Sequence, residues 1–158
     1  MSKFVFGMGQ SLDGYIAANG QTFSSSTAAP DGPPLPPPGL ELHRHFNDHV
    51  RGLAGILYGR NMYEVMTYWD HEHSDWEEIE KDFAAAWRSK PKWVVSRSLK
   101  TVGANATLVS GDLETFARRL KGDVNGEIDV AGAQLGDRCR CTAEVGVASS
   151  ERHSLPRA

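Results

Sequence analysis

Glycine, serine and arginine recur at three points of the chain in combinations that suit phosphate binding. They form the segments Gly59-Arg60-Asn61, Ser96-Arg97 and Gly132-Ala133-Gln134. A glycine before a helix lets backbone N–H groups approach a phosphate, whose negative charge the helix dipole favours. Ser96 and Arg97 combine a hydroxyl donor with a guanidinium, a pairing that suits a phosphomonoester. Their recurrence favours a dinucleotide ligand, with ordinary turn chemistry at each glycine as the alternative.

The familiar nucleotide-binding motifs do not account for these segments. Gly7-Met8-Gly9 is followed by a further glycine only at Gly14, where no helix is predicted, so the Rossmann fingerprint lacks its context. A Walker A lysine and a Gly-x-Ser-x-Gly nucleophile elbow are also missing. A dinucleotide would therefore bind by a different scheme.

The elements that must position these residues alternate between strands and helices. Short apolar runs predict strands at 3–8, 55–59, 92–97, 107–109 and 127–132. Spacings of three and four predict helices at 40–53 and 60–68, a helix ending at Lys90, and a helix over 112–120 with Asp112 as its N-cap. In the first helix, Leu42, Phe46, Val50 and Leu53 are expected to face inward. Because the strands are mostly continuous apolar runs, we predict an α/β domain with a mainly parallel sheet, whose ligands collect at the carboxyl ends of the strands.

Composition and charge exclude several classes of protein. The chain has 158 residues, 40% of them hydrophobic and 23% charged, which suits one folded domain. A net charge of −3 argues against a nucleic-acid-binding protein. No apolar run is long enough to cross a membrane, and the first residues do not form a signal peptide. We therefore expect a cytoplasmic protein without nucleic-acid or membrane partners.

Other chemically suggestive residues favour structural roles. His45 and His49 lie four apart, and His71-Glu72-His73 lies on a connector, but neither set has a third ligand at a fixed spacing, so we expect no metal site. Six prolines between Pro30 and Pro38 favour a stiff loop beside a site over a ligand for a peptide-binding domain. Two tryptophans, Trp69 and Trp76, are expected to pack beneath loops rather than stack on a substrate.

Four motifs in order resemble a known family, the dihydrofolate-reductase-like proteins. They are Ser11-Leu12-Asp13-Gly14, Tyr58-Gly59-Arg60-Asn61-Met62-Tyr63-Glu64, Pro91-Lys92-Trp93-Val94-Val95-Ser96-Arg97-Ser98-Leu99 and Val130-Ala131-Gly132-Ala133. The resemblance runs from about residue 3 to 137. It is greatest to the branch related to the reductase domain of the bacterial bifunctional riboflavin-biosynthesis deaminase-reductase. It implies a three-layer α/β/α sandwich that uses NADPH.

The resemblance also implies roles for individual residues. Gly59, Arg60 and Asn61 would meet the cofactor pyrophosphate, and Ser96 and Arg97 the adenosine 2′-phosphate. The start of a second phosphate-binding helix would be lined by Gly132, Ala133 and Gln134. The nicotinamide and the substrate would lie near Ser11, Asp13 and Gly14.

A proton donor is less well defined. Better-known reductases of the family use a carboxylate on the helix after the first loop, and Glu41 and Asp48 lie on the corresponding helix. Neither lies in a motif that aligns firmly. A solvated helix face is the alternative for both, and Asp13 is the other catalytic candidate.

The pattern changes after Asp137. Residues 138–158 hold four Arg against Glu144 and Glu151, a net charge of +2, so the rest of the chain carries −5. Large aliphatic residues nearly vanish there, and no helical or strand period continues. We therefore expect an incomplete reductase-like domain over 1–137, with its C-terminal strands missing, and an aberrant, disordered tail over 138–158. A shifted reading frame or a truncated gene would produce this pattern.

Together these observations predict an NADPH-dependent reductase of a small heterocyclic substrate. The activity it resembles is the reduction of 5-amino-6-(5-phosphoribosylamino)uracil in riboflavin biosynthesis, or that of dihydrofolate. A homodimer is compatible with this prediction. The alternative is a truncated, non-catalytic remnant that binds nucleotide weakly or needs a partner to fold.

Overall fold

The computed structural model describes residues 2–6, 40–140 and 145–147. Its strands are β1 (Lys3–Phe6), β2 (Gly55–Gly59), β3 (Lys92–Val95), β4 (Ala106–Val109), β5 (Glu127–Ala131) and β6 (Val145–Val147). Its helices are α1 (Leu40–Gly52), α2 (Arg60–Met66), the short 3₁₀ helix η1 (Thr67–Asp70), α3 (Glu78–Ser89), α4 (Leu113–Asp123) and α5 (Ala133–Arg140). Nine of these elements match the strands and helices predicted from sequence, with small shifts at their ends. None of the helices within the described ranges is both long and apolar enough to cross a membrane.

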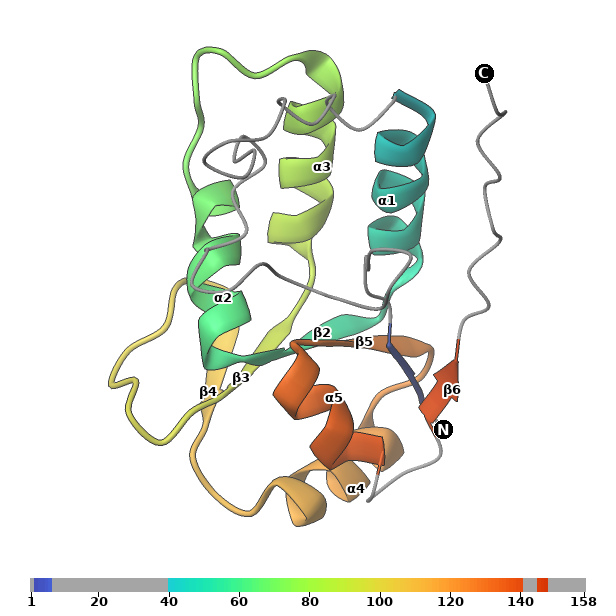
Figure 1. Ribbon diagram of the computed structural model, residues 1–158, viewed down its shortest axis with the longest axis vertical. Helices are drawn as coiled ribbons and strands as arrows, with labels where there is room; N and C mark the ends of the chain where they lie inside the picture. The colour runs from blue at the N-terminus through green and yellow to red at the C-terminus, as the bar shows by residue number, and fades with distance from the viewer. Residues whose placement is uncertain (1, 7–39, 141–144, 148–158) are drawn as a thin grey trace, which may run out of the picture.

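The strands form one parallel sheet in the order β4-β3-β2-β5-β1-β6. From β2 the chain steps outward to β3 and β4, then returns through α4 to β5, which lies between β2 and β1. Helices α1, α2 and α3 lie on one side of the sheet, and α4 and α5 lie on the other (Figure 1). The predicted three-layer α/β/α sandwich with a mostly parallel sheet is therefore confirmed.

Each face of the sheet carries its own hydrophobic cluster. On the side of α1 and α3, the ring of Trp87 is fully buried, and its Nε1 donates a hydrogen bond of 2.8 Å to the Tyr58 hydroxyl. On the other side, α4 and α5 bury Leu113, Leu120 and Leu135 against β1, β2 and β5. Alternation of side chains along each strand supplies both clusters, because neighbouring residues point to opposite faces.

Helix α5 packs so closely on the sheet that position 136 has no room for a side chain. A Cβ added at Gly136 would lie 2.6 Å from Cε2 of the Phe6 ring on β1. The absence of a side chain therefore lets this helix approach the sheet near the ends of β1 and β5.

The predicted inward face of α1 is partly wrong. Val50 and Leu53 are buried as expected, but Leu42 is 48% exposed and Phe46 is 46% exposed. Packing against α3 determines the orientation instead, because His43 meets Phe83 edge-on and Asn47 donates to the Ile79 carbonyl oxygen at 3.0 Å. The buried face of α1 therefore includes Asn47, whose side-chain amide is hydrogen-bonded, and leaves Leu42 and Phe46 exposed.

The region after residue 137 contributes regular structure. Helix α5 continues to Arg140, across the predicted boundary, and β6 pairs in parallel with β1. The expectation of a disordered tail and of a sheet without C-terminal strands is corrected for residues 138–140 and 145–147. The rest of 138–158 lies outside the described residues, and the division into a domain and a tail stays a prediction.

Candidate functional site

The candidate site lies at the carboxyl ends of β2 and β5, which are neighbours in the sheet. Tyr58 of β2 pairs with Ala131 of β5 near these ends. Helix α2 leaves the end of β2 toward one face, whereas α5 leaves the end of β5 toward the other (Figure 1). In open α/β sheets, ligands bind beyond the carboxyl ends of strands whose connections diverge in this way.

Two glycine turns lie close together at these strand ends. Gly132 has a φ of +120°, and a Cβ added to it would lie 3.7 Å from the Gly59 backbone nitrogen. A Cβ added to Gly59 would lie 3.6 Å from Cβ of Leu135 in α5. A side chain at Gly132 would be strained at this φ. The sequence therefore keeps two stretches of bare backbone side by side at the start of α2 and α5.

The start of α5 contains the predicted phosphate-binding segment Gly132-Ala133-Gln134. The amide of Gly136 donates to the Gly132 carbonyl oxygen at 2.9 Å, which closes the first turn of the helix. The amides before it have no acceptor within their own helix, and such groups bind anions. Gln134 is exposed at this end. The predicted position of Gly132, Ala133 and Gln134 at a helix start is confirmed, whereas their role as ligands stays a prediction.

Arg60 opens α2 at the end of β2 and reaches across to the β3–β4 loop. Its Nε donates to Glu64 Oε1 at 2.9 Å, and its Nη1 donates to Ser98 Oγ at 2.8 Å. The side chains of Arg60 and Glu64 are 48% and 45% exposed, so a ligand can reach them. Asn61 is also exposed beside them. The structure thus joins the Arg60 segment and the Ser96-Arg97 segment, which lie far apart in the sequence, through Ser98.

Ser96 has a structural task. It is 7% exposed, and its Oγ accepts hydrogen bonds from the backbone amides of Ser98 at 3.2 Å and Leu99 at 3.0 Å. These bonds shape the turn that follows β3 and present Arg97 and Ser98 at the surface. Arg97 is exposed, as a residue that meets a phosphate must be.

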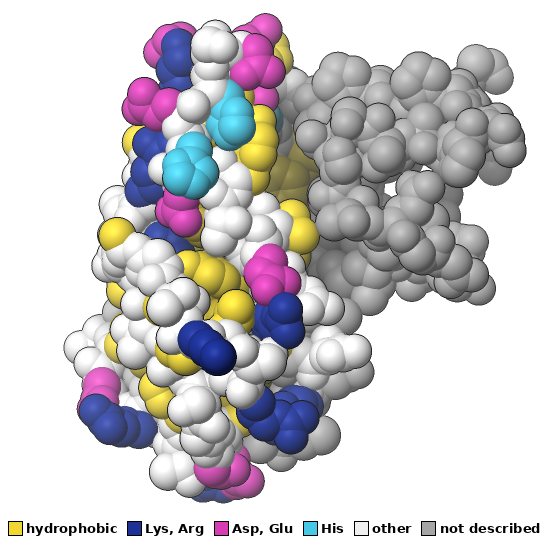
Figure 2. All heavy atoms as spheres, turned by 90° about the vertical axis from the view of Figure 1, so that its left-hand side faces the viewer, with side chains coloured by type: hydrophobic (Ala, Val, Ile, Leu, Met, Phe, Trp, Pro, Cys, Tyr) yellow, Lys and Arg dark blue, Asp and Glu magenta, His cyan; other side chains and the backbone are white. Residues whose placement is uncertain are grey.

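A second link holds this loop to α2. The amide of Gly103 donates to the hydroxyl of Tyr63 at 2.8 Å, and Tyr63 is 4% exposed. The loop is thereby tied to α2 at both Ser98 and Gly103. On the face drawn in Figure 2, Lys and Arg side chains lie in both the upper and the lower half of the molecule, whereas the visible His side chains lie in the upper half.

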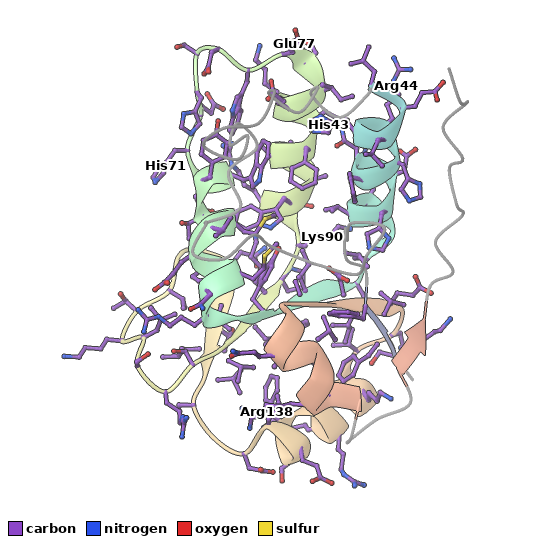
Figure 3. The ribbon with its side chains drawn as sticks, in the orientation of Figure 1. His43, Arg44, His71, Glu77, Lys90 and Arg138 are labelled. Carbon is purple, nitrogen blue, oxygen red and sulfur yellow. The ribbon has the colours of Figure 1, made fainter. Side chains whose placement is uncertain are left out.

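The predicted carboxylate donors are not brought to this site. Glu41 and Asp48 lie on α1, which ends next to the amino end of β2. Figure 3 shows Arg44 on the part of α1 away from the sheet, and Glu41 precedes it in the same helix. Asp48 accepts a hydrogen bond of 2.9 Å from Arg51 and is 76% exposed. The other candidates, Ser11, Asp13 and Gly14, lie outside the described residues.

Several charged groups between α1 and α3 pair with one another. Arg51 pairs with Asp82 across the two helices, and Asn47 Nδ2 donates to the same carboxylate at 2.9 Å. These hydrogen bonds hold the pKa of Asp82 below its usual value. Asn47, Arg51 and Asp82, which link the two helices, line part of a groove of about 1020 Å³. Asp48 belongs to the same ion-pair network, because Arg51 bonds both Asp48 and Asp82. A structural role therefore explains the position of Asp48.

Two residues of the site received no role in the sequence analysis. Ser98 and Glu64 both contact Arg60, although the motifs that contain them predict no such contact. Glu64 could have been found from its i,i+4 spacing to Arg60, which places the two side chains on one helix face. Ser98 could not, because its partner lies on another element.

Solved structures include remote relatives of this chain. The chain is similar to the crystal structure of a putative riboflavin biosynthesis protein from Shewanella sp. PV-4, with 24% sequence identity and a TM-score of 0.48. The similarity covers 85% of this chain and 67% of that one. No family model and no curated protein matches the sequence. The fold class therefore rests on the sheet order and the two helical layers described above.

Proposed function

We propose that NADPH binds at the carboxyl ends of β2 and β5 and that the protein is a reductase of a small heterocyclic compound. The observation that carries this proposal is the close approach of the glycine turns at Gly59 and Gly132. Bare backbone from two helix starts is what a diphosphate needs for close approach. The location at a topological switch point supports the same ligand class.

The residues present fit such a cofactor. The diphosphate would accept from the first amides of α5 and from Arg60, with Ser98 as a further donor. Arg97 would meet the 2′-phosphate, because an exposed guanidinium offers paired donors to a phosphomonoester. Ser96 would hold the turn that carries Arg97, through the two backbone bonds to its Oγ.

Bound NADPH would supply the hydride, and the chain would orient it and exclude water. By resemblance, the substrate side of the site belongs to Ser11, Asp13 and Gly14. The motif resemblance favours a pyrimidine of riboflavin biosynthesis as substrate and a cytoplasmic location. Binding and reduction are separate parts of the proposal, and binding is tested first.

A titration of the purified protein with NADPH and NADH tests the binding step. We expect micromolar NADPH binding, followed by ligand fluorescence, with a clear preference over NADH. Arg97→Ala is expected to remove most of that preference, because the 2′-phosphate loses its guanidinium. Lys100→Ala removes an exposed positive charge from the same loop and serves as the matched control.

The outcomes separate the proposal from its alternative. A cooperatively unfolding protein that binds neither nucleotide would refute the proposed site. Absence of binding together with non-cooperative melting would support a remnant that needs a partner to fold. An unchanged preference in Arg97→Ala would remove Arg97 from the site and leave the rest of the proposal standing.

A further inference from the structure

Glu64 is a carboxylate placed next to the cation that would hold the diphosphate. It accepts from Nε of Arg60 at 2.9 Å, within the same helix. Ser98 accepts from Nη1 of the same guanidinium at 2.8 Å. These two bonds approach Arg60 from different elements, so they fix the direction in which the guanidinium points.

The remaining donors of Arg60 are still able to bind a ligand. A guanidinium carries its N–H groups in a rigid fork, so the two bonds leave Nη2 and the second hydrogen of Nη1 for another acceptor. The side chain is 48% exposed, which leaves room for that acceptor. An anion bound there would lie close to the Glu64 carboxylate, because both would contact the same guanidinium.

We propose that Glu64 lowers the affinity of Arg60 for the cofactor diphosphate and so keeps the cofactor readily exchangeable. This inference rests on the proposed function, since it assumes that the diphosphate binds at Arg60. The physical cause is repulsion between like charges that share one cation. Glu64 is thus an affinity-determining residue beside the binding site, with no contact to the ligand required.

A purely structural role for Glu64 predicts the opposite effect. If the carboxylate served only to hold Arg60 in place, weakening that bond would loosen the guanidinium and reduce affinity. Exposed pairs of this kind add little to stability. Glu64→Gln retains a hydrogen-bond acceptor for Nε but removes the charge, so the sign of its effect distinguishes the two roles.

The experiment is a titration of wild type and Glu64→Gln with NADPH and with NADH at low salt. We expect the variant to bind both nucleotides about fivefold more tightly, since both carry the diphosphate. The gain should shrink at high salt, because screening weakens interactions between exposed charges. Dissociation of bound NADPH, followed by stopped-flow fluorescence, should slow correspondingly.

Asp123→Asn is the matched control. Arg119 Nε donates to Asp123 Oδ2 at 3.3 Å, again with an arginine four residues before its carboxylate on an exposed helix face. Asp123 ends α4 just before the amino end of β5, whereas Arg60 follows the carboxyl end of β2. In a parallel sheet these two places lie at opposite ends of the strands. This variant changes the net charge equally and is expected to leave nucleotide affinity unchanged.

Three results would overturn the inference. Equal affinity of wild type and Glu64→Gln, or weaker binding by the variant, would refute repulsion by Glu64 while leaving the proposed function intact. A gain confined to NADPH would show that Arg60 meets the 2′-phosphate instead of the diphosphate. Absence of nucleotide binding by the folded wild type would refute both the proposed function and this inference.

Discussion

Replacing Trp87 with alanine is expected to lower the free energy of unfolding by about 3–5 kcal/mol. Trp87 is fully buried between α3 and the sheet, and its Nε1 donates to the Tyr58 hydroxyl at 2.8 Å. Its ring also lies 4.0 Å from Nζ of Lys92, whose pKa is lowered by burial. The alanine variant would therefore create a cavity. The Tyr58 hydroxyl would lose its hydrogen-bond donor, and the Lys92 ammonium would lose its contact with the ring.

Urea unfolding of the two proteins measures this loss. Leu42→Ala is the control, because Leu42 is 48% exposed on α1 and its truncation should change stability by less than about 0.5 kcal/mol. A loss below about 1 kcal/mol for Trp87→Ala would contradict the described core, since buried tryptophan truncations cost more. A large loss for Leu42→Ala would instead support the inward face predicted from sequence.

Removing the guanidinium at the candidate site is expected to have the largest effect on binding. Arg60→Ala should weaken NADPH binding by about tenfold to a hundredfold, the value of a charge-assisted hydrogen bond to phosphate. Stability should change little, because Arg60 is half-exposed and its bonds to Glu64 and Ser98 lie at the surface. Titration calorimetry gives the affinity, and thermal unfolding checks the fold.

Two further variants sharpen this prediction. Arg60→Lys keeps the charge but loses the forked donors, so it should recover only part of the affinity. Arg119→Ala removes an arginine from α4 that also pairs with a carboxylate four residues later and is 80% exposed, and it should leave binding unchanged. Unaltered NADPH affinity in Arg60→Ala would place the nucleotide elsewhere on the protein.

Much of the layered fold could be predicted because local signals agree with the tertiary structure. Asp112 caps α4 by accepting from the Thr115 amide at 2.8 Å, as its residue type predicted. Continuous apolar runs such as Ile56-Leu57-Tyr58 are buried on both faces of the sheet, which is typical of parallel strands. Such features depend on residues that are neighbours in the sequence, so they can be predicted without knowledge of distant contacts.

The misassigned face of α1 shows where local reasoning fails. Apolar spacing cannot reveal that Asn47 has hydrogen-bond acceptors on α3, so its burial was not foreseen. The helical and strand structure after residue 137 was missed for a related reason. Helix α5 depends on the close contact between Gly136 and Phe6, and β6 depends on pairing with β1.

The candidate site was predicted in its segments but not in its connections. The glycine turns and Arg60 lie at strand ends, where the sequence placed them. The bridge from Arg60 to Ser98 joins residues that are 38 positions apart, and the buried Oγ of Ser96 serves the loop backbone. Both features follow from how the β3–β4 loop folds onto α2, which no local pattern encodes.

Backbone amide shifts provide the most direct test of the central claim that a dinucleotide binds where β2 and β5 end. An NADPH titration of the ¹⁵N-labelled protein should shift the amide signals of 59–61, Ser98 and 132–134 together, with a common affinity. Unchanged signals in these segments, with shifts confined to Asn47, Asp82 and their neighbours between α1 and α3, would contradict it.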